Sequence, residues 1–113
     1  MTRRSLEFLK GTLDVVILKT LSVGPLHGYG ISRWVRAATG DDFSIDEGAL
    51  YPALRRLEKR GYVESEWGTT ETGREAKFYQ LTRAGVEELD SEMRNWERYV
   101  EAMSAVLGSA SLP

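Results

Sequence analysis

Apolar residues recur at helical spacing along much of this chain, and in one stretch they alternate with polar residues instead. The first helical pattern covers residues 5–21 and is apolar on more than one side, which predicts a helix that buries two faces. Gly24 and Pro25 end it in a turn, and a second helix is expected over residues 28–38. Gly28 at its start favours close approach, either of a neighbouring helix or of a phosphate to the helix amino terminus.

The third helical pattern, residues 44–60, divides into an apolar and a basic face. Leucines at i, i+4 and i+7 line one side of a helix: Leu50, Leu54 and Leu57. Asp46 can cap the first turn, and Gly61 follows where a helix ends in the left-handed conformation. The opposite face and its flanks hold a phenol, a proline and three cations: Tyr51, Pro52, Arg55, Arg56 and Lys59.

Two interpretations of this basic-faced helix are equally supported by the stretch alone. A short helix that is held by a core and presents cations fits the DNA major groove, which is wide enough to admit it. An ordinary amphipathic helix with a solvated outer face has the same pattern. Pro52 adds a difficulty, because proline lacks an N–H and disfavours a helix interior. The helix therefore either begins late, near Tyr51, or is bent in its first two turns.

After Gly61 the pattern changes to two short strands, residues 62–67 and 76–82, around a turn rich in Gly and Thr. Val63 and Trp67 are expected to face inward. Three helices followed by such a hairpin predict a winged helix-turn-helix, an α+β fold that is mostly α with a small β-hairpin. The hairpin tip carries two cations that can reach a phosphate or the minor groove, or can simply aid solubility: Arg74 and Lys77.

The last stretch predicts a long helix, capped by Thr82, with an apolar seam over three heptads. The seam consists of seven residues: Val86, Leu89, Met93, Trp96, Val100, Met103 and Leu107. With nothing left in the chain to cover it, we expect it to meet another copy of itself and the first helix in a twofold homodimer. The chain would then divide into a winged helix-turn-helix DNA-binding domain, residues 1–82, and a C-terminal dimerisation helix, residues 83–113, with a frayed tail from Ser109.

Composition excludes many kinds of catalytic chemistry. The 113 residues include no cysteine and a single histidine, His27, so neither a disulfide nor a Cys/His zinc site can form within one chain. There is no serine beside an evident base and no glycine-rich phosphate loop. We therefore expect no enzyme, no catalytic residue, no metal and no cofactor. His27 lies in a predicted turn, which favours a turn or capping role.

Hydropathy and charge bear on where the protein acts and on its partners. No apolar run approaches the roughly 20 residues of a membrane helix, and residues 1–11 are too charged for a signal peptide, so we expect a cytoplasmic protein without membrane contact. The net charge of −2 argues weakly against nucleic acid. Residues 1–80 hold 12 Lys or Arg and 11 Asp or Glu, a net of +1, whereas residues 81–113 hold 3 and 6, a net of −3. This uneven layout is compatible with DNA binding by the basic helix.

Several separate segments, in the same order, resemble the PadR family of bacterial transcriptional regulators. They are GTLDVVILKTLSVGPLHGYGI, EGALYPALRRLEKRGYV, WG, AKFYQLTRAG and the late Trp96. The match runs from about Leu9 to Leu107 without an evident gap, and the length is similar to that of the short-tailed subfamily, in which one C-terminal helix makes the dimer. The resemblance implies a winged helix-turn-helix homodimer that represses genes by binding double-stranded DNA at a palindromic promoter site.

Residue roles follow from the same resemblance. It places the recognition helix at residues 47–60 and accounts for Pro52, since the triplet LYP recurs within that helix in such proteins. It also places the start of the supporting helix, with Tyr29, Gly30 and Ser32, near the DNA backbone. Two cations match the basic wing: Arg74 and Lys77. Glu75 departs from the family pattern, because relatives often carry a basic residue there, and this weakens the expected wing contact.

Some short-tailed relatives are multidrug sensors in which the late tryptophan of each subunit stacks on a planar ligand at the dimer centre. The matching positions here are Trp96, with Asp14, Val15 and Leu18 of the first helix. This implies a planar hydrophobic effector that relieves repression. The alternative is that Trp96, a core heptad position, only packs the dimer, and the ordinary nature of a seam tryptophan favours this by about two to one.

Pattern and resemblance together predict a dimeric DNA-binding repressor. Phosphate contacts are expected from four side chains: Tyr51, Arg56, Lys59 and Lys77. Base readout is expected from Arg55 and from the helix start near Ala49. The competing hypothesis is a protein-interaction module that acts without DNA, through the heptad C-terminal helix.

Overall fold

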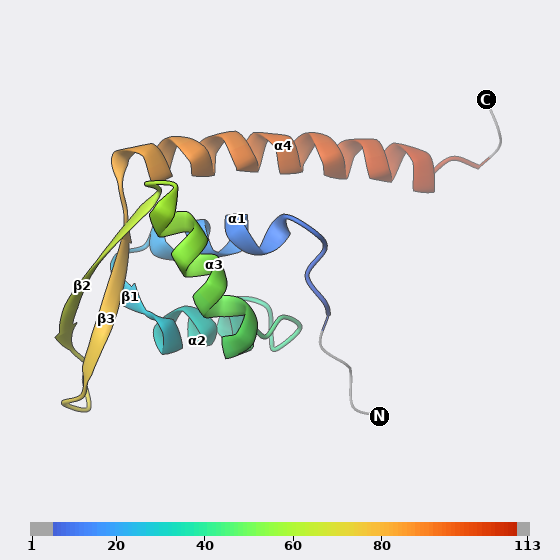
Figure 1. The fold of residues 1–113 in the computed structure, drawn as a ribbon. Coiled ribbons are helices and arrows are strands. Elements are labelled where there is room, and N and C mark those ends of the chain that lie inside the picture. The colour runs from blue at the N-terminus through green and yellow to red at the C-terminus, as the bar shows by residue number, and fades with distance from the viewer. Residues whose placement is uncertain (1–5, 111–113) are drawn as a thin grey trace.

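The computed structural model describes residues 6–110, which form α-helices and a three-stranded antiparallel sheet of order β1-β3-β2 (Figure 1). The elements follow in the order α1 (Thr12–Leu21), β1 (Leu26–His27), α2 (Gly28–Ala38), α3 (Glu47–Lys59), β2 (Val63–Thr69), β3 (Glu75–Leu81) and α4 (Arg83–Leu107). This arrangement confirms the predicted α+β winged helix-turn-helix with a long C-terminal helix. The hairpin of β2 and β3 is the wing, and α3 is the helix that lies beside it.

The core lies where α1, α2, α3 and the base of the sheet meet. The leucine stripe of α3 is buried, as predicted: Leu50, Leu54 and Leu57. It packs with apolar residues of α1 and α2: Ile17, Leu18, Ile31 and Val35. Val63 at the start of β2 is also buried, whereas Trp67, on the same face of the strand, is 70% exposed, so the expectation that Trp67 would be covered like Val63 was wrong. The helix layer ends before the sheet does, and the outer part of the wing projects beyond it (Figure 1).

Helix α3 begins at Glu47, which excludes the late start considered for it. Asp46 caps it as predicted, because its carboxylate accepts a hydrogen bond of 2.8 Å from the N–H of Ala49. Pro52 lies inside the helix near its exposed first turns, where the carbonyl left without an N–H partner can be hydrated. Gly61 has φ 81°, the left-handed conformation expected where the helix ends.

The amino-terminal segment departs from prediction. Helix α1 begins at Thr12, because Gly11 is left-handed (φ 84°), and the expected start at Ser5 lies outside the described residues. Leu6 instead forms a parallel bridge with Phe43, and the ring of Phe8 stacks on Phe43 with centroids 4.4 Å apart. Apolar residues that resembled a helical face therefore cover the loop between α2 and α3.

Strand β1 was not predicted, because two residues are too short to have a period. His27 pairs with Phe78 of β3, and the two rings meet edge to face at 5.2 Å, which ties the start of α2 to the wing. The predicted capping role of His27 is confirmed, since its Nδ1 accepts a hydrogen bond of 3.1 Å from the N–H of Gly30. Helix α2 spans residues 28–38 as predicted.

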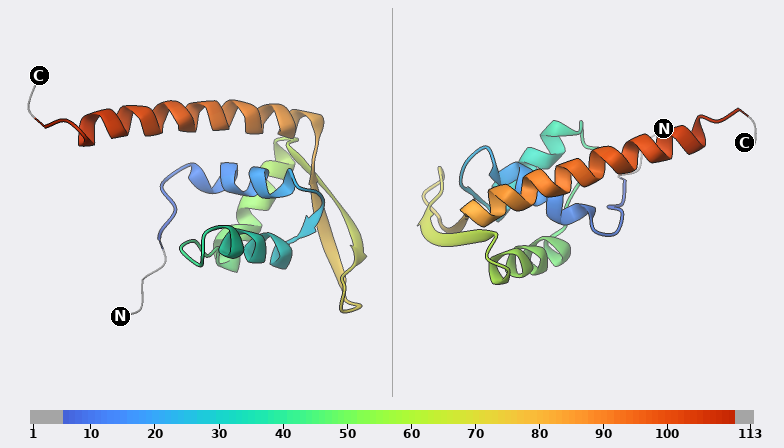
Figure 2. Two further views of the ribbon diagram at one scale, coloured as in Figure 1. Left: turned by 180° about the vertical axis from the view of Figure 1, so that it is seen from behind. Right: turned by 90° about the horizontal axis from the view of Figure 1, so that it is seen from above.

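Helix α4 runs beside α1 and continues well past the body of the protein (Figures 1 and 2). Leu89 is 5% exposed within the core and Met93 packs against that core, so the expectation that nothing in the chain covers the seam was wrong for these two residues, whereas Val86 is 49% exposed. Farther along, seam residues are open to solvent: Trp96, Val100, Met103 and Leu107. Ser109 and Ala110 follow the helix, and the rest of the expected frayed tail lies outside the described residues.

Substituting Gly85 with alanine is expected to destabilise the fold by about 2–3 kcal/mol, a fall in Tm of about 10–20 °C. A Cβ at this position would lie 1.9 Å from the backbone carbonyl oxygen of Tyr62, where α4 crosses the start of the wing. Thermal unfolding by circular dichroism measures the change. Gly30→Ala is the matched control, because its nearest neighbour is the flexible tip of Leu26 at 3.2 Å. Equal Tm values for the two variants would contradict the prediction.

Candidate nucleic-acid interface

The face of α3 that points away from the core is exposed and carries the predicted phenol, proline and cations. The exposed side chains are Ala49, Tyr51, Pro52, Arg55 and Lys59. The start of α3 lies beside α2 at the end of the molecule opposite α4, on the side toward which the wing projects (Figure 1). Because the leucine stripe holds the other face in the core, this surface has a fixed orientation relative to the wing.

The ring of Tyr51 packs against the amino terminus of α2. A Cβ added to buried Gly28 would lie 2.5 Å from the Tyr51 hydroxyl oxygen, so glycine is what permits the approach. Of the two uses considered for Gly28, the contact with a neighbouring helix is the one observed. Tyr51 remains 39% exposed, and the contact fixes which part of its ring faces solvent.

Gly28→Ala is expected to keep the fold but displace the Tyr51 side chain, because a hydroxyl at the end of a side chain yields more readily than backbone. If Tyr51 contacts a DNA phosphate, affinity for duplex DNA should fall about tenfold. Anisotropy of a labelled duplex measures this, with Tm measured in parallel. Tyr51→Phe keeps the ring and separates loss of the hydroxyl from its displacement. An unchanged affinity for Gly28→Ala would exclude this role of Tyr51.

The exposed side of α2 adds a cation that the sequence analysis missed. Tyr29 is 68% exposed and stacks on the His27 ring, with an interplanar angle of 4°. The guanidinium carbon of Arg33 lies 5.7 Å from the Tyr29 ring centroid. The signal in the sequence was the i, i+4 spacing of Tyr29 and Arg33 on the polar side of α2.

Ser32, predicted at the DNA backbone, is half-buried, and its hydroxyl donates to the Ile45 carbonyl at 3.5 Å, so it positions the loop before α3.

Arg56 does not lie with the other cations. Its guanidinium donates a hydrogen bond of 2.7 Å to the carboxylate of Asp14 on α1, and Arg60 approaches the same carboxylate at 3.9 Å. A partly exposed ion pair contributes little to stability, but it turns Arg56 toward α1. The phosphate role of Arg56 and the ligand role of Asp14 stay predictions; within one protomer the two side chains join α3 to α1.

The flank of α3 that faces the wing is joined to it by polar contacts. The Glu58 carboxylate accepts a hydrogen bond of 2.7 Å from the Ser65 hydroxyl of β2. Burial raises the pKa of the Tyr79 phenol above its usual value; the Glu58 carboxylate and Tyr51 act in the same direction, and the Arg55 guanidinium opposes them. Arg55 therefore lies at the boundary between the outer face of α3 and the wing.

The wing carries its two predicted cations in exposed positions. Lys77 of β3 pairs across the hairpin with Trp67 of β2, and Arg74 lies in the connecting turn. Within this turn Arg74 donates its N–H to the Thr70 hydroxyl at 3.1 Å. Glu75 pairs across the hairpin with Thr69, beside both cations.

The residues predicted to bind a planar ligand are not assembled within one protomer. Leu18 is 1% exposed in the core of the protomer and Val15 is half-buried on α1, so their ligand contacts stay predictions. Trp96 on α4 is 44% exposed, and its ring stacks on Tyr99 with centroids 5.9 Å apart. Among residues 6–110 no helix is long and apolar enough to span a membrane, and no group of three or more His, Cys, Asp or Glu could hold a metal.

Comparison with known proteins identifies relatives over nearly the whole chain. The model of the transcriptional regulator PadR-like family matches residues 17–91. The structure of a transcriptional regulator from Clostridium thermocellum is 33% identical and has a TM-score of 0.78, with coverage of 85% of this chain and 93% of the other. Uncharacterized protein X of Lysinibacillus sphaericus is 30% identical over 95 residues, 84% of this chain and 87% of that protein.

A third relative is a longer protein, the negative transcriptional regulator PadR of Bacillus subtilis. It is 32% identical over 77 residues, 68% of this chain but 42% of that protein. Its crystal structure in complex with operator DNA matches at 30% identity with a TM-score of 0.64, and covers 73% of this chain and 46% of the other. This chain thus spans less than half the length of that regulator.

Proposed function

Because this chain belongs to the PadR-like family of transcriptional regulators, we propose that it is a homodimeric repressor that binds a palindromic promoter site. The observation that carries the proposal is the basic outer face of α3, anchored by its leucine stripe beside the exposed start of α2. The complex of the Bacillus subtilis relative with operator DNA and its description as a negative regulator support the same mode of action. A family of transcriptional regulators favours neither an enzyme nor a module that acts without DNA.

In the proposed complex α3 enters the major groove. Ala49 and Arg55 read base edges, and other side chains set the register on the phosphates: Tyr29, Arg33, Tyr51, Lys59, Arg74 and Lys77. Pro52 lies on the same exposed face and limits how closely the first turns approach the groove floor. Arg56 is omitted because Asp14 holds it, and Ser32 acts through the loop that precedes α3.

We further propose that residues up to 82 form the DNA-binding unit and that α4 forms the dimer. The open apolar seam beyond Met93 supports this assignment, since it needs a partner to be covered. The seam spacing is also nearly symmetric about Trp96, since seam residues lie 3, 7 and 10 positions before it and 4, 7 and 11 positions after it. In an antiparallel pair with its twofold axis there, seam positions come level with one another: Met93 with Val100, and Val86 with Leu107. Met103 comes level with Leu89, whose own side chain is buried in the core of its protomer.

Disulfide trapping tests this alignment cleanly, because the chain contains no cysteine. The double variant Val86→Cys, Leu107→Cys is expected to form a covalent dimer under mild oxidation, since antiparallel pairing brings the two positions together. Leu107→Cys alone is expected to remain uncrosslinked. Crosslinking by that single variant would instead indicate parallel helices, and non-reducing gel electrophoresis distinguishes the two outcomes.

We also propose that a planar effector binds at the dimer centre. The stacked rings of Trp96 and Tyr99 support it, because they offer a flat aromatic surface on the predicted twofold axis. Such a ligand relieves repression only if it binds better to a dimer whose recognition helices are wrongly spaced. Quenching of tryptophan fluorescence by a planar cationic dye, lost in Trp96→Phe, tests this; unchanged quenching in that variant contradicts it.

The deciding experiment for the function is fluorescence anisotropy with DNA from immediately upstream of the protein's own gene. A scrambled duplex is the control, at about 0.15 M salt. We expect preference for the native fragment and a steep loss of affinity between about 50 and 200 mM salt, as phosphate contacts release counterions. Absence of binding to either duplex, or a flat salt response, would contradict the proposal.

A further inference from the structure

We propose that the wing meets DNA with the face that looks toward α3, where the exposed ring of Trp67 packs against a deoxyribose beside the phosphate held by Lys77. The inference rests on the proposed function and deepens it, because it assigns a DNA contact to a residue that the sequence analysis expected in the core.

Alternation along the strands fixes that direction. Val63 and Tyr79, which are 2% and 6% exposed, face the helices, and residues at even spacing from them share that face. Trp67 is four residues after Val63, and Lys77 is two before Tyr79. The two are also direct cross-strand partners, so their side chains emerge together from the α3-facing side of the sheet.

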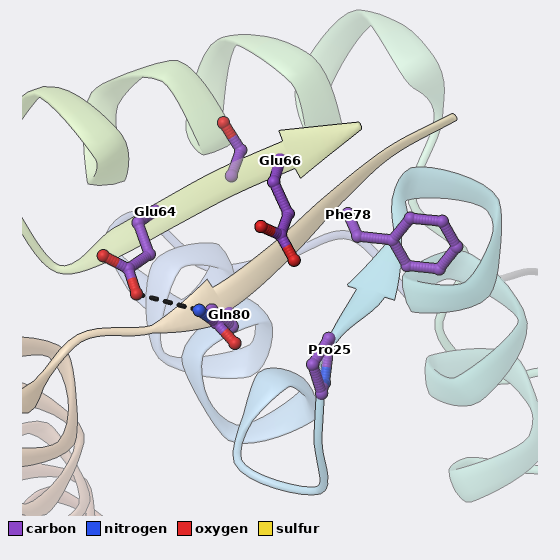
Figure 3. A pocket seen from close by; sticks show the side chains of 6 residues that line it. Pro25, Glu64, Glu66, Phe78 and Gln80 are labelled. Atoms are coloured by element: carbon purple, nitrogen blue, oxygen red, sulfur yellow. Dashed lines mark hydrogen bonds between the residues drawn. The ribbon is translucent and has the colours of Figure 1, made fainter. Parts of the chain in front are cut away.

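The two faces of the wing differ in charge. Figure 3 shows Glu64 and Glu66 pointing to the other side, where with Pro25, Phe78 and Gln80 they line a pocket of about 280 Å³. Glu64 accepts a hydrogen bond of 2.8 Å from the Gln80 amide there (Figure 3). Two carboxylates on that surface repel a polyanion, so the side that carries Lys77 is the one suited to phosphate.

The position of Trp67 also fits the path of a DNA strand. When α3 occupies the major groove and a wing reaches the adjacent minor groove, the sugar-phosphate strand between the grooves must cross the surface between them. That surface includes Arg55 on the flank of α3, and then Trp67 and Lys77. Glu75, on the same face but nearer the tip, keeps the strand at the level of Trp67 and away from Thr69.

A large ring at this point has a physical use. Trp67 is 70% exposed, so it contributes little to the core. Packing its face on a sugar removes apolar surface from water without demanding a particular base, and the adjacent ammonium neutralises the phosphate. The contact would therefore raise affinity for any duplex rather than select a sequence.

The test uses a random-sequence duplex of about 30 bp, long enough for two half-sites roughly 10 bp apart, titrated from about 50 to 200 mM salt. Trp67→Ala is expected to weaken binding about tenfold with an unchanged slope of log K against log salt, because no charge is removed. Lys77→Gln should reduce that slope by about 2 per dimer. Trp67→Phe should recover part of the affinity, and Glu66→Gln, on the opposite face, should leave binding nearly unchanged.

The outcomes separate this inference from the function on which it rests. Wild-type affinity for Trp67→Ala, with Lys77→Gln weakened, would overturn the ring contact and leave the DNA-binding function intact. Strengthening by Glu66→Gln as great as the weakening by Trp67→Ala would place DNA on the other face of the wing, because the lost carboxylate would have repelled a phosphate there. Failure of the wild-type protein to bind the duplex at low salt would overturn both. Circular dichroism of each variant confirms that an affinity change does not arise from unfolding.

Discussion

Arg55→Glu is expected to reduce affinity for DNA more than about 100-fold at about 0.15 M salt. Arg55 lies on the exposed face of α3, on the flank where the wing begins. In a dimer the substitution removes two cations and adds two anions within the proposed groove contact, so lost attraction and new repulsion add together. Anisotropy with the upstream duplex measures the affinity, and thermal unfolding should be nearly unchanged because the side chain is outside the core.

The matched control is Arg83→Glu, which makes the same change of charge at the start of α4. Arg83 is 96% exposed, and its one partner among the described residues is Glu87 at 4.0 Å. We expect it to weaken binding only by the general effect of net charge, several-fold at most. If both variants lost affinity equally, the effect of Arg55 would be electrostatic and nonspecific, and α3 would lose its assignment as the recognition helix.

The helices were predictable where one face had to be buried and the ends had capping residues. Helix α3 shows this, since its leucine stripe and Asp46 were both readable from the sequence. Residues 6–11 were wrongly predicted as helical, because their apolar side chains have a helix-like spacing but cover Phe43 instead of forming another helical turn. Strand β1 was missed because its two residues are defined only by their partners in β3.

The candidate site was predictable in its helix but not in its details. Arg55 and Arg56 are neighbours in sequence with the same charge, yet about 100° of helical rotation turns one toward the wing and the other toward Asp14. Trp67 fits the inward alternation of β2, yet it is 70% exposed. Such outcomes depend on where other elements end, which no local pattern contains.

Met103→Asp is expected to yield a folded monomer that binds the proposed palindromic site at least about 100-fold more weakly. Met103 is 41% exposed on the part of α4 that extends past the body, so a carboxylate there remains hydrated in a monomer and is buried only in the proposed dimer. Once the dimer is lost, two half-sites are no longer held together, and the gain from linked binding disappears. Sedimentation velocity measures the mass, and anisotropy the affinity.

Leu89→Asp is the informative companion, although both residues belong to the same heptad seam. Leu89 is 5% exposed in the core of its own protomer, so a charge there is expected to abolish cooperative unfolding rather than merely to separate subunits. The two variants therefore distinguish the part of α4 that completes the core of the protomer, around Leu89, from the part around Met103 that is covered only in the proposed dimer. A surviving Met103→Asp dimer would show that the interface lies elsewhere, and a folded monomeric Leu89→Asp would show that the inner half of α4 is dispensable to the core.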